Sequence, residues 1–171
     1  MRRALVALVC LLLLAPAGTA RAAGRFGWPL APPHPVLRPF SAPATPYGPG
    51  HRGVDLGGAV GEPVLAAADG VVRFAGTVVD RPLVSLDHGR GLRTTYEPVT
   101  PRVTTGQRVR RGDVLGLLRP GHPGCVVAGS ADRACLHWGA LRGGEHVDPL
   151  GLVAPGRVRL LPLTLTSRPA R

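Results

Sequence analysis

The sequence predicts an all-β domain, and three observations lead to this prediction. From residue 51 onward the chain contains short apolar runs rich in Val, Leu and Thr, which are typical of β-strands. Glycine and proline, 24 and 19 residues of the chain, separate these runs and interrupt every candidate helical period. The length of 171 residues favours one domain that buries a core of its own.

The expected elements follow one another along the chain. Residues 23–44 are rich in proline and predict an extended lead-in, residues 45–152 predict the β core, and residues 153–171 predict an edge strand with a loose tail. Within the core, "DHGRG" at residues 87–91 predicts a hairpin whose glycines supply positive φ. A second turn-rich link, "TTGQRVRRGDVLG", covers residues 104–116. The runs expected to form strands are "PVLAAADG", "GVVRFAG", "PLVSLDHG", "GLRTTYEPV", "DVLGLL" and "CLHWGAL".

Residues 1–22 predict a signal peptide. "MRR" provides the charged start, an apolar run covers residues 4–14, and an A-x-A pattern at residues 20–22 predicts cleavage. The apolar run is too short to cross a membrane, and no comparable run follows it. We therefore expect a secreted monomer, extracellular or associated with the cell wall, without a permanent membrane anchor.

The chain is strongly basic. Its formal net charge is +11, and all 21 basic residues are arginine. Outside the cell this charge favours anionic partners such as cell-wall polymers or lipid headgroups over nucleic acid. Aromatic residues, 4% of the chain, are too scarce to form a base-stacking surface among the arginines. The alternative is a solvated surface, or the composition of a GC-rich genome, which requires no partner.

Loss of the expected signal peptide leaves two cysteines, Cys125 and Cys135. An even pair in a secreted chain predicts a disulfide, because thiols oxidise outside the cell. The disulfide would close a loop of about ten residues, which typically contributes about 2–4 kcal/mol to stability.

Candidate chemistry begins at "GHRGVDLGG". His51 and Asp55 are four residues apart, so on an extended segment both side chains point to the same face and can reach one metal ion. Gly53, between them, would leave the space beside the ion open. An isolated H-x-x-x-D pair is weak evidence, because such pairs also occur on ordinary surfaces. The hypothesis of a metal site therefore needs a third ligand.

His137, in "ACLHWGAL", is the candidate third ligand. Strand alternation would turn Leu136 and Trp138 toward the core, and Cys135, His137 and Gly139 toward the other face. Two histidines and one aspartate leave one position of a tetrahedral zinc for water, as in catalytic rather than structural sites. The alternative is a half-buried histidine that is hydrogen-bonded to the backbone.

Four blocks of the chain resemble, in order, the lysostaphin-like, LytM-type zinc metallopeptidases, which cut peptide cross-links in bacterial peptidoglycan. The blocks are "GHRGVDLGGAVGEPVLAAADGVVRFAG", "VSLDHGRGLRTTYEPV", "VTTGQRVRRGDVLGLL" and "LHWGAL", and the resemblance covers roughly residues 45–152. It implies an antiparallel β core with one zinc ion in a groove on a sheet. It also implies that the zinc ligands are His51, Asp55 and His137.

The two usual catalytic histidines of this family are absent. One would lie two residues after Tyr96 and the other would begin an H-x-H motif, where this chain has Pro98 and Cys135. Neither proline nor a disulfide-bonded cysteine can transfer a proton, a contribution of typically about 10²–10⁴-fold to the rate. Two other states of Cys135 stay open: a free thiol, or a fourth zinc ligand that closes the site.

Three other residues are candidates for the missing chemistry. Glu97, adjacent to the vacated position, could act as a base, although on a regular strand it points opposite to Tyr96. Tyr96 could donate to an oxyanion, or simply pack in the core. His122 lies on a loop that the expected disulfide would draw toward the groove, although a loop histidine is commonly part of an ordinary surface.

The remaining histidines and two arginines have weaker indications. His88 is expected to support the hairpin turn, and His34 and His146 are expected to be structural. Arg52 and Arg142 could bind substrate carboxylates or could be solvated surface residues.

Two functions follow from these residues. The first is a secreted zinc metalloendopeptidase that remodels or lyses the cell wall, which the complete ligand set favours. The second is a catalytically impaired module that keeps its zinc and binds the wall or regulates other wall hydrolases, which the absent histidines favour.

Overall fold

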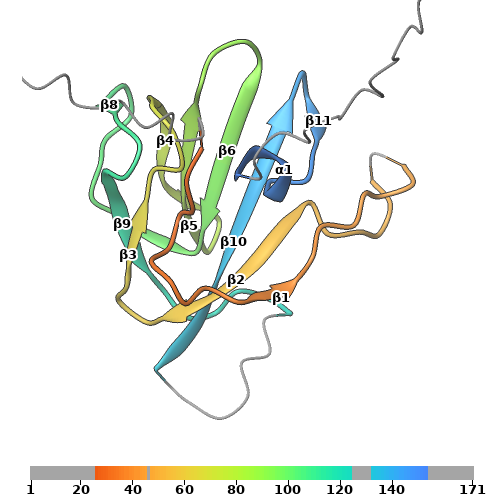
Figure 1. The fold of residues 1–171 in the computed structure, drawn as a ribbon, viewed down its shortest axis with the longest axis horizontal. Helices are drawn as coiled ribbons and strands as arrows, with labels where there is room; N and C mark the ends of the chain where they lie inside the picture. Colours follow the sequence, from red (N-terminus) through yellow and green to blue (C-terminus); the bar gives the residue numbers. More distant parts are fainter. Residues whose placement is uncertain (1–25, 46, 125–131, 154–171) are drawn as a thin grey trace, which may run out of the picture.

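The computed structural model describes residues 26–45, 47–124 and 132–153, and these contain eleven strands and one short helix (Figure 1). The first six strands are β1 (Val36–Arg38), β2 (Gly53–Ala59), β3 (Pro63–Leu65), β4 (Gly70–Val78), β5 (Arg81–Asp87) and β6 (Leu92–Glu97). The others are β7 (Val99–Pro101), β8 (Arg108–Val109), β9 (Val114–Leu118), β10 (Arg133–Arg142) and β11 (Glu145–His146), followed by α1 (Leu150–Val153).

The strands form two sheets in which every pair is antiparallel. The larger sheet has the order β1-β2-β10-β6-β5-β4-β8, with β11 paired to β10, and the smaller has the order β3-β9-β7. The hairpin expected at residues 87–91 joins β5 to β6, with Gly89, Arg90 and Gly91 at positive φ. The prediction of an all-β, antiparallel fold is therefore confirmed.

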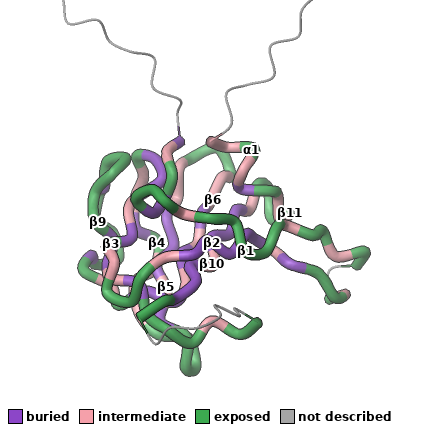
Figure 2. Tube along the Cα trace, turned by 60° about the horizontal axis from the view of Figure 1, so that its bottom comes forward, coloured by how far each residue is buried: buried purple, intermediate pink, exposed green. Residues whose placement is uncertain are grey.

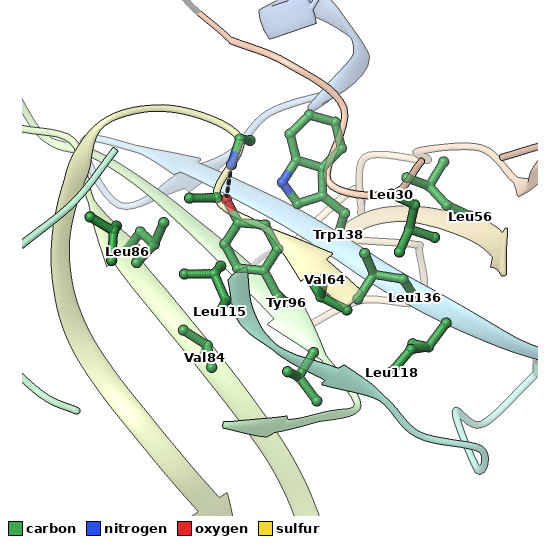
Figure 3. Packing of buried hydrophobic residues seen from close by; sticks show 14 of the residues in the cluster. Leu30, Leu56, Val64, Val84, Leu86, Tyr96, Leu115, Leu118, Leu136 and Trp138 are labelled. Atoms are coloured by element: carbon green, nitrogen blue, oxygen red, sulfur yellow. Dashed lines mark hydrogen bonds between the residues drawn. The ribbon is translucent and has the colours of Figure 1, made fainter. Parts of the chain in front are cut away.

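The core lies against one face of the central strands. Trp138 of β10 and Tyr96 of β6 are fully buried beside Leu136, and apolar residues of both sheets surround them (Figure 3). The buried segments gather at the centre of the molecule, with exposed loops around them (Figure 2). Burial of each large apolar side chain stabilises the fold by roughly 1.5–3 kcal/mol. Because one face of β2, β10 and β6 packs in this core, only the opposite face of these strands is available for a functional site.

The lead-in and the C-terminal end differ from the expectation in detail. Part of the lead-in forms β1, which pairs with β2 and makes the edge of the larger sheet. The short helix α1 was not predicted. The Asp148 carboxylate accepts a hydrogen bond from the backbone N–H of Leu150 at 2.9 Å and caps the start of this helix.

The expected signal peptide and the expected strand and tail after residue 153 lie outside the described residues. None of the helices in the described segments is long and apolar enough to cross a membrane.

Candidate metal centre

Three adjacent strands place three polar residues in one row. In the sheet register His137 of β10 lies directly opposite Asp55 of β2 on one side and Glu97 of β6 on the other. Residues that lie directly opposite each other point to the same face of a sheet. Trp138, the next residue of β10, lies opposite Tyr96 and points into the core. The row therefore lies on the face that the core leaves free, which we call the ligand face.

The predicted metal ligands meet at one oxygen atom. Oδ1 of Asp55 lies 2.8 Å from Nδ1 of His137 and 3.0 Å from Nε2 of His51. The two histidine nitrogens lie 3.1 Å from each other. His51 and Asp55 are buried, and the side chain of His137 is 18% exposed. The sequence prediction of where these three residues lie thus agrees with the structure, since their potential ligand atoms form one tight cluster.

The backbone of the lead-in orients His51. The Nδ1–H of His51 donates to the carbonyl oxygen of Pro39 at 2.7 Å, because a carbonyl can only accept. In the neutral imidazole this leaves Nε2 with a free lone pair directed at Asp55. Ligating histidines commonly have such an outer hydrogen bond, which fixes the tautomer and the ring orientation. The β-bridge between Ser41 and His51 holds the two segments together at this point.

Gly53 makes room for the ring of His137. A Cβ at position 53 would lie 2.7 Å from Nε2 of His137 and 2.5 Å from the carbonyl oxygen of Trp138, which is too close for either contact. The sequence predicted that this glycine leaves space open beside the ion, whereas in the structure it makes room for a ligand. The space is occupied by the ligand ring itself.

The cluster has the donor set and the charge of a metal site. Lone pairs of two neutral histidines and a carboxylate repel one another at these distances unless a cation, a proton or a metal ion, lies between them. The other oxygen of Asp55, Oδ2, is buried and has no hydrogen-bond partner among the described residues. Two histidine nitrogens and one carboxylate oxygen are typical zinc ligands. The residues present therefore fit zinc.

The electrostatics keep Asp55 ionised. Burial raises the pKa of its carboxyl. Hydrogen bonds from His122 and His137 and the charges of His122 and His51 lower this pKa, and together they outweigh the effect of burial. The net result is a pKa well below the ordinary value. Asp55 therefore presents a carboxylate to a cation at any physiological pH.

His122 joins the same cluster. Its Nε2 lies 3.3 Å from Oδ1 of Asp55, and its ring stacks on that of His137 with centroids 5.0 Å apart and planes at 22°. The ligand atoms of His51, Asp55, His122 and His137 all lie within 4.8 Å of one another. The prediction placed His122 near the groove, but the structure brings it into contact with the metal ligands. Cys135, on the same strand face, is not a member of this group.

Glu97 lies on the ligand face. It does point opposite to Tyr96, as expected, and this orientation favours it because Tyr96 is the residue that turns into the core. Its carboxylate lies 3.4 Å from the guanidinium of Arg81. Both line a pocket of about 220 Å³, together with residues 119–123, which include His122. Glu97 is thus the acidic side chain that borders both the pocket and the ligand row.

The prediction of a catalytic role for Tyr96 is wrong, because its hydroxyl lies in the core. The hydroxyl accepts a hydrogen bond from the backbone N–H of Ala67 at 3.1 Å (Figure 3). It is also hydrogen-bonded to Thr94 at 2.9 Å. Burial raises the pKa of Tyr96 to about 12. A phenol that is fully buried behind the sheet cannot donate to a substrate on the opposite face.

The three remaining histidines, His34, His88 and His146, are not members of the ligand cluster. His88 bridges the carbonyl of Asp69 and the hydroxyl of Thr94, at 2.7 and 2.8 Å, and so ties the hairpin turn to β6. The ring of His34 packs on Trp28, with centroids 4.3 Å apart. Burial, and then the positive charge of Arg52, lower the pKa of His146.

The two candidate arginines do not meet at the cluster. The guanidinium of Arg52 donates to the carbonyl of Gly48 at 3.2 Å. Arg142 is exposed at the far end of β10, five residues from His137, or roughly 16 Å along a strand. The structure therefore gives no support for a pair of arginines that together clamp a substrate carboxylate.

The two residues at the positions of the usual catalytic histidines, Pro98 and Cys135, have different surroundings. Pro98 follows the last residue of β6 and lines the pocket beside Glu97. Cys135 is buried on β10 opposite Gly57. Its expected disulfide partner, Cys125, lies outside the described residues, so the disulfide stays a prediction.

The protein thus has an antiparallel β-sheet whose free face carries a cluster of histidines and one aspartate. Among the described residues this cluster is the single candidate zinc site. Comparison with protein families identifies the protein more closely, because the model of peptidase family M23 matches residues 49–149. The chain belongs to this family. Its members are zinc-dependent metallopeptidases that act on peptidoglycan.

Individual relatives agree with this assignment. An uncharacterized protein of Mycobacterium tuberculosis, Rv2891, is 48% identical over 167 residues, which are 95% of this chain and 65% of the relative. The DD-carboxypeptidase/endopeptidase Mpg of Neisseria gonorrhoeae is 29% identical over 71% of this chain and 25% of its own length. The catalytic domain of lysostaphin from Staphylococcus simulans shares the fold, with a TM-score of 0.56 and 20% identity over 70% of this chain and 92% of that domain. The chain thus spans less than two thirds of these two sequence relatives.

Proposed function

We propose that this protein is an exported zinc metalloendopeptidase that cuts peptide cross-links of bacterial peptidoglycan. The family assignment supports the reaction class. The similar protein Mpg is named a DD-carboxypeptidase/endopeptidase, which supports a peptidase reaction. Loss of residues 1–22 removes Arg2, Arg3 and Arg21 and leaves a formal net charge of +8, which supports an anionic polymer as the surface on which the protein works.

The observation that carries the proposal is the ligand cluster. Nε2 of His51, Oδ1 of Asp55 and Nδ1 of His137 lie within 3.1 Å of one another. Bound zinc would supply a Lewis acid that polarises a peptide carbonyl. An ordinary surface pair of histidine and aspartate would not be expected to contact a third potential ligand, His137, 82 positions away from Asp55 in the sequence.

The chain's own residues divide the remaining work. His51, Asp55 and His137 would hold the metal. Glu97, on the same face and beside the pocket, would accept the proton of the attacking water, which neither Pro98 nor a disulfide-bonded Cys135 could do. The guanidinium of Arg81, 3.4 Å from the carboxylate of Glu97, would orient it.

The test is direct. Purified protein that starts at residue 23 is supplied with zinc and incubated with peptidoglycan of several cross-link types, and new amino termini are identified by mass spectrometry. We expect new termini from at least one type, and a rate at least 100-fold lower for His51→Ala. His34→Ala, which removes a histidine outside the cluster, serves as the matched control and should retain activity. If no termini appear beyond the level of His51→Ala, the enzyme proposal is wrong.

Export has its own test. We propose that the chain leaves the cell through the segment at residues 1–22, on the evidence of its charged start, apolar run and A-x-A pattern. Amino-terminal sequencing of the protein from culture medium and from washed cell walls should give Ala23 as the first residue. Recovery of an intact Met1 chain in the cytoplasm alone would contradict this.

A second function, a zinc-retaining module without catalysis, is favoured by one specific observation. Both usual catalytic histidine positions have lost their proton-transfer groups, to Pro98 and Cys135. In this case the protein should bind zinc and sediment with purified cell walls, yet release no new termini. The same incubation therefore separates the two functions.

A further inference from the structure

His122 reaches the cluster from outside the strands that carry the three predicted ligands. It lies in the sequence "PGHPG", residues 120–124, which follows β9. Its side chain is only 10% exposed, although the segment is a surface connection. The imidazole is buried because it packs on the ring of His137 and points Nε2 at Asp55.

The distance of His122 from Asp55 is compatible with a shared metal ion. In a tetrahedral zinc site with bonds of 2.0–2.1 Å, neighbouring ligand atoms lie about 3.3 Å apart. Nε2 of His122 is 3.3 Å from Oδ1 of Asp55, and the ligand atoms of His51, Asp55 and His137 lie 2.8–3.1 Å from one another. All four ligand atoms lie within 4.8 Å of one another. Three of them belong to the predicted triad, so His122 is the one further residue of this group that could bind the same ion.

We propose that His122 is a fourth protein ligand of the metal and that it is displaceable, so that the resting site has no vacant position. This inference rests on the proposed zinc site and adds regulation to it. Catalytic zinc sites keep one position for water or substrate, whereas sites with four protein ligands are closed. Hydrolysis then requires His122 to leave the metal, and the resting protein is latent.

Two observations identify His122 as the ligand that leaves. His51 is held by a hydrogen bond from Nδ1 to Pro39, whereas Nδ1 of His122 is buried without a hydrogen-bond partner among the described residues. Loss of such an outer hydrogen bond typically weakens metal binding by about 10–100-fold. Asp55 and His137 lie on paired strands, whereas the backbone around His122 turns at Gly121 and Gly124, with φ of 100° and 79°.

Movement of His122 would also connect the metal to the substrate side. His122 forms one wall of the pocket of about 220 Å³ that Glu97 and Arg81 line. His122 therefore borders both this pocket and the metal ligands. A peptide that enters the pocket can therefore displace His122, and the same displacement would expose the metal to Glu97.

The test compares wild-type protein with His122→Ala and with the control His34→Ala, all loaded with Co²⁺ in place of zinc. Four-coordinate Co²⁺ absorbs strongly in the visible, and the spectrum changes when a protein ligand is replaced by water. We expect a changed spectrum for His122→Ala only, and restoration toward the wild-type spectrum by millimolar imidazole. Competition with a chromophoric chelator should show zinc affinity at least tenfold lower for His122→Ala.

The outcomes separate this inference from the proposed function. If zinc binds and depends on His51, Asp55 and His137 while His122→Ala leaves affinity and spectrum unchanged, the fourth ligand is wrong and the metal site stands. If wild-type protein binds no zinc, the proposed function itself fails. If His122→Ala lowers the rate of peptide hydrolysis more than tenfold with unchanged zinc affinity, His122 transfers a proton instead, and the inference is overturned.

Discussion

At the scale of single residues, the site depends on one carboxylate oxygen and the space around it. Three histidine nitrogens lie 2.8–3.3 Å from Oδ1 of Asp55. The histidines hold the pKa of this carboxyl below its usual range in spite of burial, so one negative charge is always present. A buried charge is expensive without a cation, and therefore the cluster favours a bound metal over an empty site.

Gly53→Ala tests the space beside that oxygen. The added methyl group would meet the ring of His137 and the carbonyl of Trp138 at less than 3 Å, and neither can move far within the paired strands. We expect at least tenfold weaker zinc binding and a fold destabilised by about 1–3 kcal/mol, as for overpacking in a core. Isothermal titration with zinc and chemical denaturation measure the two effects.

Gly57→Ala is the matched control for Gly53→Ala. Gly57 lies on the same face of the same strand, but its added Cβ would meet side-chain carbons of Pro35 and Leu37 at 3.1 and 3.2 Å. Side chains at this edge can shift by a few tenths of an ångström. Zinc affinity should therefore stay within about threefold of wild type. Equal loss of affinity in both variants would show that a general effect on β2 is responsible.

At the scale of strands, the register of β2, β10 and β6 assigns two adjacent residues to opposite faces. Glu97 shares a row with His137 and Asp55, whereas Tyr96 shares a row with Trp138. The face of Glu97 is therefore a property of strand pairing rather than of its own sequence neighbourhood. This makes Glu97 the candidate base and Tyr96 a core residue.

Glu97→Gln tests the proposed proton transfer. The amide keeps the shape of the side chain and cannot accept the proton, so peptide hydrolysis should fall by about 10²–10⁴-fold. Zinc affinity should hardly change, because Glu97 is not a member of the ligand cluster. Glu145→Gln, on the exposed strand β11, removes a comparable charge away from the cluster and should keep full activity. Wild-type turnover in Glu97→Gln would exclude Glu97 as the base.

Tyr96 gives the fold a specific alkaline sensitivity. Burial raises the pKa of its phenol to about 12 in the folded protein, so folding favours the protonated form. This contribution to stability is complete below about pH 10, the ordinary tyrosine pKa, and is lost as pH rises through the folded value. The chain contains no lysine, because all 21 basic residues are arginine, and therefore few other groups titrate in this range.

Chemical denaturation between pH 9 and 12 measures this effect. The free energy of unfolding of wild-type protein should decrease from about pH 10 upward. Tyr96→Phe should have a flatter profile and a stability lower by about 1–3 kcal/mol at neutral pH, because the N–H of Ala67 loses its buried acceptor. Its zinc affinity should equal that of wild type, and loss of zinc binding would contradict the assignment of Tyr96 to the core.

At the scale of the whole molecule, local patterns predicted more than long-range geometry. Apolar runs and glycine positions predicted the strands, and the spacing of His51 and Asp55 predicted a shared face, because these depend on neighbours in sequence. The strand pattern around His137 made it the candidate third ligand, and the resemblance implied the same set of three. The contact of His122 and the orienting carbonyl of Pro39 depend on how a loop and the lead-in pack across the sheet, which no local pattern encodes.

The ligand cluster joins distant parts of this fold. His51 lies two residues before β2 and Asp55 lies in it, His122 follows β9, and His137 lies in β10. These residues are up to 86 positions apart in the sequence. The unfolded chain presents no such arrangement, so the metal should bind the folded state almost exclusively. Its binding free energy is then also folding free energy.

Zinc should therefore stabilise the whole domain, and thermal unfolding tests this without any substrate. At free zinc 100-fold above its Kd, the stabilisation is about 2.7 kcal/mol. For a domain of this size that corresponds to a rise in Tm of about 10 °C, which a chelator should reverse. His137→Ala should unfold at the same temperature with and without zinc, because it lacks a central ligand. An equal rise in Tm in wild type and in His137→Ala would show that zinc binds elsewhere on the protein, and the assignment of this cluster as the metal site would fail.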